Sequence, residues 1–250
     1  MLNILWRNMK WWFQNPVSIG VTVLQPLIWM VLYSSVAGRT MQNIGIGNYT
    51  AFILPGVIVL VTLAACCSSG FLNFLMKSNG SFYRILIAPV NRSAIVLGQM
   101  LEAILVSFIE VAILCAVGLF FSVTVASGIA GVLLMILLIF LSAFFMSGLT
   151  YTLSLFIPNE VIYETTMNAI VLPLFFLSPA LFPLESLSGG LAIAVRLNPF
   201  TYIINALRSL ILGEKILWGN ILPVVALFAV LCCGSFTLAL WRLKRETTYS

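Results

Sequence analysis

The chain has 250 residues, of which 62% are hydrophobic and 8% are charged, and its formal net charge is +5. A soluble domain of this length carries roughly a quarter charged residues, so these values exclude a water-soluble fold and indicate a lipid environment. The chain contains neither His nor Asp, which excludes most metal sites and most acid–base catalysis.

Long uncharged windows predict an all-α polytopic membrane protein with six transmembrane helices in one domain, 1–250. Each window has about 19–27 residues, enough to cross a hydrocarbon core of roughly 30 Å at about 1.5 Å per residue. Each span must be helical, because an open strand in lipid leaves backbone groups without hydrogen-bond partners. The predicted spans are 18–37, 52–75, 95–120, 130–156, 165–183 and 219–241.

The N-terminal stretch "LNILWRNMKWWFQNP" precedes the first span and mixes aromatic with basic residues. Trp6, Trp11 and Trp12 stand beside Arg7 and Lys10. Indole rings favour headgroup depth and cations favour lipid phosphates, so this pattern predicts an interfacial amphipathic helix in contact with membrane lipid. The alternative is an aromatic belt that flanks the first span.

The loop between the second and third predicted spans, 76–93, contains "NGSFYRILIAP". Asn79 and Gly80 predict a turn, and Ser81 is a candidate cap for a short helix. The apolar side chains within that helix recur at helical spacing and give it one apolar face. Such a helix either docks into a groove on a soluble partner or rests on the bilayer. The residues that we single out here are Lys77, Ser81, Phe82, Tyr83, Arg84, Ile85, Leu86 and Pro89.

The third predicted span carries a stripe of polar residues. At about 100° per residue, Gln99, Glu102 and Glu110 lie within about 80° of one another. Acids inside a span face the bundle interior or a cavity and mark a transport pathway or a proton site, or else they make structural hydrogen bonds between helices. Glu160 and Glu164, one helical turn apart near the fifth span, are predicted to be solvated.

The stretch "RLNPFTYIINALRSLILG" predicts a helix too short to cross a bilayer. Asn198 is a good N-cap, Pro199 suits the first helical position and Gly213 is a plausible stop, which gives about 14 residues or roughly 21 Å. A second short apolar helix of about 12 residues lies upstream, interrupted at Gly189–Gly190. Arg208 either snorkels to the interface or serves in gating or pairing.

The basic residues predict the orientation of the chain. With six spans, eight of the twelve fall on the side of the two termini: Arg7, Lys10, Lys77, Arg84, Arg92, Arg242, Lys244 and Arg245. The other four are Arg39, Arg196, Arg208 and Lys215. This bias predicts cytoplasmic termini. A seventh span would place the C-terminal cluster outside, so we interpret 184–215 as an outer re-entrant helical pair between spans five and six.

Three stretches together resemble the type-2 export permeases of the ATP-binding-cassette superfamily. "LNPFTYIINALRSLILG" is similar to their C-terminal signature at Asn198, Pro199, Tyr202, Arg208 and Gly213. "QPLIWMVLYSSVAG" resembles their first span, and "GSFYRILIAPVNRSAIVLGQ" resembles their cytoplasmic loop. The segment 76–84 departs from the family pattern because it has no acidic residue.

The resemblance implies a permease of the cell membrane that works as a dimer with a second copy or a paralogue. Cytoplasmic ATP-binding-cassette subunits would dock on the 76–93 loop. It also implies export of drugs, lipids or lipid-linked molecules by alternating access, with 184–215 as a gate. The drug and lipid-like branch fits better, since the basic, Tyr-containing run of the polysaccharide branch is missing before the first span.

The sequence contains no Gly-Lys-Ser/Thr phosphate loop, so we expect no ATPase activity and no cofactor in this chain. ATP and Mg would bind the partner subunit. We expect no nucleic-acid partner, since the positive charge reflects membrane orientation. The alternative function is a secondary transporter or channel that uses Glu102 and Glu110 as a proton site.

Overall fold

The computed structural model describes residues 5–6, 9–10, 14–42, 49–87, 90–121, 123–181, 189–213 and 215–246. Every regular element in these ranges is an α-helix, which confirms the all-α prediction. The helices are α2 (Pro16–Gln42), α3 (Tyr49–Ser78), α4 (Ser81–Ile87), α5 (Arg92–Phe120), α6 (Gly128–Phe156), α7 (Glu160–Phe176), α8 (Gly190–Leu197), α9 (Pro199–Leu212) and α10 (Trp218–Glu246).

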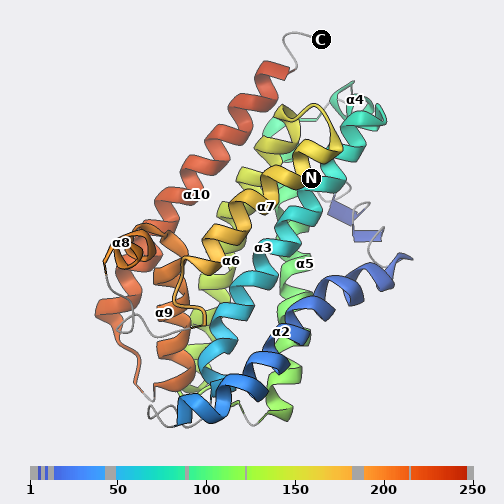
Figure 1. Cartoon of the computed structure of the whole chain (residues 1–250). Helices are drawn as coiled ribbons and strands as arrows, with labels where there is room; N and C mark the ends of the chain where they lie inside the picture. Colours follow the sequence, from blue (N-terminus) through green and yellow to red (C-terminus); the bar gives the residue numbers. More distant parts are fainter. Residues whose placement is uncertain are drawn as a thin grey trace.

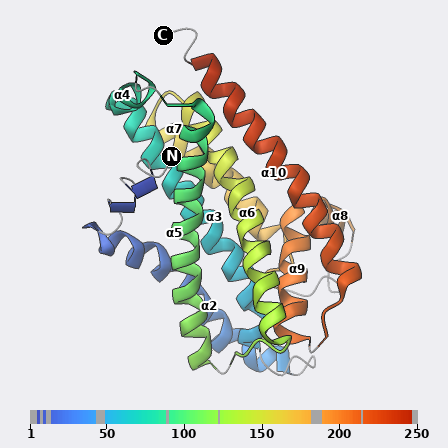
Figure 2. The same cartoon turned by 180° about the vertical axis from the view of Figure 1, so that it is seen from behind.

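The long helices form an elongated bundle with α3 at its centre (Figure 1). α3 packs against α2, α4, α5, α6, α7 and α9, and 83% of its most apolar window is buried. The corresponding value for α10 is 28%, so α10 lies at the periphery, where it packs mainly on α6 (Figure 2). A hydrophobic helix with such a large exposed share is stable only when lipid or another chain covers it.

The chain is a multi-pass membrane protein, and four described helices are long and apolar enough to cross a bilayer: α3, α5, α6 and α10. α8 and α9 meet at a bend of 80° and, taken as one span, would make a fifth. α2 contains the shorter apolar helix Gly20–Leu32, and α7 has only 17 residues, so the count of six spans stays a prediction.

The fifth span differs most from its predicted bounds of 165–183. α7 begins at Glu160, because the Asn159 side chain caps it by accepting a hydrogen bond from the Ile162 amide at 2.9 Å. α7 ends at Phe176, well before the predicted end. Pro183, the last residue of the predicted span, lies outside the described residues.

Most of the predicted N-terminal interfacial helix, including Arg7, Trp11 and Trp12, lies outside the described residues. Of its described part, Met9 is buried in a small cluster with Ala65 of α3 and Val106 of α5. This segment therefore contacts the bundle itself at Met9.

Candidate functional site

The first residue before α9 ties this helix to the end of α7. Asn198 is the N-cap of α9, and its side-chain oxygen accepts a hydrogen bond from the Phe200 amide at 3.0 Å. Its Nδ2 group donates to the carbonyls of Leu174 and Leu177 at 2.7 and 2.8 Å. Since Asn198 is buried, one amide side chain satisfies backbone groups of two helices where water is excluded.

Arg208, further along α9, turns its guanidinium group toward the interior. Its Nε donates to the Phe52 carbonyl of α3 at 3.1 Å, and its Cζ lies 3.7 Å from the centroid of the Phe52 ring. One Nη donates to the Pro179 carbonyl and lies 3.5 Å from the Ala180 carbonyl. A guanidinium group held by these carbonyls pairs with the bundle and does not snorkel outward.

The turn after α7, residues 177–181, is the irregular backbone that these side chains stabilise. Tyr49, at the start of α3, donates its hydroxyl group to the Leu181 carbonyl at 2.9 Å. Gly56 of α3 approaches the same turn so closely that an added Cβ would lie 2.6 Å from the Ala180 Cβ. We call this arrangement of Tyr49, Asn198, Arg208 and the turn 177–181 the α9 junction.

The predicted ends of α9 are confirmed. The helix has 14 residues, with Asn198 as its N-cap, Pro199 at its first position and Gly213 as its C-cap. Tyr202, the remaining signature residue, donates its hydroxyl group to the Arg196 carbonyl at 2.9 Å and so links α9 to α8. α8 starts at Gly190, next to the predicted interruption, and is shorter than predicted, with 8 residues.

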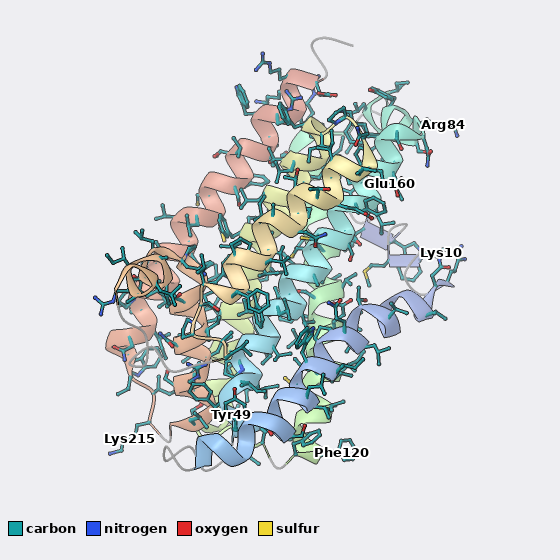
Figure 3. The ribbon with its side chains drawn as sticks, viewed as in Figure 1. Lys10, Tyr49, Arg84, Phe120, Glu160 and Lys215 are labelled. Atoms are coloured by element: carbon teal, nitrogen blue, oxygen red, sulfur yellow. The ribbon has the colours of Figure 1, made fainter. Side chains whose placement is uncertain are left out.

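A second candidate site lies at the end of the bundle that carries α4, opposite Phe120 and Lys215 (Figure 3). Gly80 takes a left-handed conformation (φ 74°) in the turn before α4, as the Asn-Gly pair predicts. Phe82 and Ile85 are buried in a core formed with α5, α6 and α10. The core residues from these three helices are Ile95, Val96, Met100, Tyr151, Leu155, Ala239 and Leu243.

This burial corrects the predicted docking face of the 76–93 loop. Phe82 and Ile85 pack into the chain's own bundle, so they are not available to a soluble partner. The outer face of α4 presents Tyr83, Arg84 and Ile87 instead. Ser81 is exposed at the start of α4, and Pro89 lies outside the described residues.

Lys77 connects the same end of three helices. Its Nζ forms an ion pair with Glu246 Oε1 of α10 at 2.6 Å and donates to the Leu155 carbonyl near the end of α6 at 2.5 Å. Arg242 adds a second contact to Glu246 at 3.4 Å. The carboxylate that pairs with Lys77 therefore comes from the far end of the sequence and not from the segment 76–84.

All three residues of the predicted polar stripe on α5 are buried, but they face different neighbours. The Ser69 hydroxyl of α3 donates to Glu102. Glu110 interacts with Thr22 of α2. Among the described residues, neither Glu110 carboxyl oxygen has a partner at hydrogen-bonding distance. Glu102 and Glu110 therefore face different helices, α3 and α2, and Glu110 is the less satisfied acid.

A cavity of about 600 Å³ lies between α2, α3 and α7, and we call it the α2–α3–α7 cavity. α2 and α7 each pack on α3, and α3 lies between them (Figure 1). The walls include Thr22 of α2, Phe71 of α3, and Tyr163, Glu164 and Asn168 of α7. The cavity combines aromatic and apolar surface with a few polar groups, as small-molecule sites generally do.

No motif or spacing in the sequence indicates this cavity. Glu164 and Glu160 look alike in the sequence, and both are exposed as predicted. Only Glu164 lines the cavity, because α7 turns that side toward α2 and α3. A hydrophobic pattern shows which face of α7 is polar, but it does not show what that face encloses.

Comparisons with known proteins agree with this architecture. A family model described as "ABC-2 type transporter" matches residues 1–212, from the N-terminus to the end of α9. The transport permease ycf38 of Cyanophora paradoxa is 26% identical over 220 residues, covering 87% of this chain and 76% of that protein. The daunorubicin resistance ABC transporter permease protein DrrB1 of Streptomyces coeruleorubidus is 26% identical over 249 residues, covering 97% and 86%.

Proposed function

Because the chain belongs to the ABC-2 type transporter family, we propose that it is the membrane-spanning subunit of an ATP-driven exporter. The family match carries this proposal, since it includes both the α4 loop and the α9 junction. The similarity to a permease named for daunorubicin resistance supports efflux of a drug-like, lipid-like or otherwise amphipathic molecule.

ATP hydrolysis would take place on separate cytoplasmic ATP-binding-cassette subunits that bind ATP and Mg. The docking face would be the exposed side of α4, with Tyr83, Arg84 and Ile87. An aromatic, a cationic and an apolar side chain on one short helix suit a groove with an acidic rim. Lys77 would position this helix through Glu246 and would not itself contact the ATPase.

In the proposed topology, α2, α3, α5, α6, α7 and α10 cross the cell membrane, and both termini are cytoplasmic. α8 and α9 would enter the outer leaflet and return, as the 80° bend between them permits. Irregular backbone at membrane depth is tolerated only where protein satisfies its polar groups, and the α9 junction supplies such groups to the turn 177–181.

A second permease copy or a paralogue would complete the cargo pathway. α2 and α7 expose large apolar side chains on both sides of the α2–α3–α7 cavity, among them Val21, Leu24, Val161 and Leu172. A facing copy would cover these side chains and would enclose the cavity between the subunits.

Movement of α4 would reach the bundle through its buried residues. Phe82 and Ile85 share a core with α5, α6 and α10, so a push on α4 would tilt these helices together. This rigid coupling suits alternating access, in which the cavity opens to one side of the membrane at a time, with α8 and α9 as the outer gate.

The test is reconstitution in vesicles of the full-length chain together with the ATPase that copurifies with it. We expect ATP-dependent movement of the uncharged aromatic amphiphile N-phenyl-1-naphthylamine, and loss of this movement when the ATPase lacks its catalytic carboxylate. Movement driven by a pH gradient without the ATPase would instead favour the secondary transporter, with Glu110 as the site of protonation.

A further inference from the structure

The α2–α3–α7 cavity has an uneven charge distribution. Among the described residues that line it, Glu164 is the only one with a formal charge. The other polar lining groups include the Thr22 hydroxyl and the Asn168 amide. No described Lys or Arg lies within ion-pair distance of Glu164. A cavity between apolar helices that holds an uncompensated carboxylate creates a negative potential, which a bound cation can neutralise.

A second carboxyl group lies behind the wall of this cavity. Glu110 of α5 is completely buried and interacts with Thr22, which itself lines the cavity. Within the described part of the chain, its two carboxyl oxygens lack a hydrogen-bond partner at bonding distance. A buried acid with unused acceptor capacity beside a cavity is a feature of ligand pathways rather than of helix packing.

The aromatic side chains that line the cavity also suit a cationic ligand. Phe71 and Tyr163 face each other across α3 and α7, with ring centroids 5.8 Å apart. The Tyr163 hydroxyl already donates to the Cys67 carbonyl at 3.0 Å, which fixes the ring in place. Aromatic faces attract cations and stack on flat apolar bodies, so the rings and the carboxylate favour one chemical class.

We propose that the α2–α3–α7 cavity binds aromatic amphiphiles that carry a positive charge, and that Glu164 is the residue that selects for the charge. This inference rests on the proposed function and names the class of cargo. Thr22 and Asn168 orient the ligand, and Phe71 and Tyr163 contact its aromatic body.

The test compares two ions of similar size and shape, the cation tetraphenylphosphonium and the anion tetraphenylborate. Their equilibrium binding is measured on the full-length chain with its ATPase in lipid nanodiscs, after subtraction of binding to empty discs. We expect the cation to bind more tightly than the anion, and Glu164→Gln to weaken cation binding roughly tenfold, since the carboxylate that attracts the cation is lost.

Glu160→Gln is the matched control. It removes the same charge one helical turn before Glu164, at a position that does not line the cavity. We expect it to change cation binding less than twofold. Equal binding of the two ions, or equal effects of Glu164→Gln and Glu160→Gln, would overturn the proposal. ATP-dependent movement of N-phenyl-1-naphthylamine is scored separately on the same protein, so failure of the exporter function and failure of the cation site are distinguishable.

Discussion

The α9 junction and the α2–α3–α7 cavity lie on the same central helix but differ in how their polar groups are satisfied. At the junction, the side chains of Asn198, Arg208 and Tyr49 donate to backbone carbonyls of α3, α7 and the turn 177–181. At the cavity, Glu164 has no ion-pair partner among the described residues, and the flanking helices expose apolar side chains.

This difference in hydrogen bonding indicates that the α9 junction is a rigid part of the molecule, whereas the α2–α3–α7 cavity has groups that a bound molecule could satisfy. A buried carbonyl without a donor costs about 1–3 kcal/mol, so a junction with several satisfied carbonyls resists rearrangement. Exposed apolar helices and an uncompensated acid have the opposite property, because in the proposed assembly cargo or a second subunit would improve their environment. The junction would then move as one body while the cavity opens and closes.

The largest expected effect comes from a substitution of Arg208 that disrupts the α9 junction. Arg208→Ala leaves the carbonyls of Phe52 and Pro179 without their donor and removes the contact with the Phe52 ring. We expect a loss of about 4 kcal/mol in the free energy of unfolding, measured by SDS titration in mixed micelles. Arg196→Ala is the control, since the Arg196 side chain is exposed on α8. Similar losses for both variants would mean that Arg208 acts only as a surface cation.

The next effect separates the two hydrogen-bonding roles of Asn198. Asn198→Ala removes the cap of α9 and the donor to Leu174 and Leu177, and we expect a loss of about 3 kcal/mol in the same titration. Asn198→Ser keeps a good capping oxygen but cannot reach both carbonyls, so it should recover about 1 kcal/mol. Full recovery by serine would show that the link to α7 contributes nothing to stability.

Local capping chemistry explains why α9 could be predicted from the sequence. Asn198, Pro199 and Gly213 specify where the helix begins and ends through interactions within a few residues, and the structure has the same ends. The end of α7 depends on a local signal that the prediction passed over and on a contact that no local pattern contains. Pro179 lies three residues after Phe176 and disfavours a longer helix. Asn198, which lies more than 20 residues further along the chain, donates to the Leu174 carbonyl near the helix end.

The candidate sites show the same limit. Helical periodicity found the apolar face of α4 at Phe82 and Ile85, but only the structure shows that the chain's own bundle covers it. Periodicity also grouped Gln99, Glu102 and Glu110 on one face of α5. In the structure, Glu102 contacts α3 and Glu110 contacts α2. The spacing along one helix defines a face, whereas the neighbours of that face depend on the packing of all the helices.

The smallest expected effect comes from adding one methyl group, once at the α9 junction and once on the exposed face of α2. In Gly56→Ala, the new Cβ would lie 2.6 Å from the Ala180 Cβ and 2.7 Å from its Cα, so the backbone of the turn 177–181 must shift. We expect a loss of about 2 kcal/mol in the free energy of unfolding, as is usual for an overpacked core. Gly20→Ala makes the same change on α2, where nothing lies within 4 Å, and the higher helix propensity of alanine should stabilise the protein by about 0.5 kcal/mol. Equal tolerance of both substitutions would mean that the junction adapts as freely as the open face, and the distinction between a fixed and a changeable region would fail.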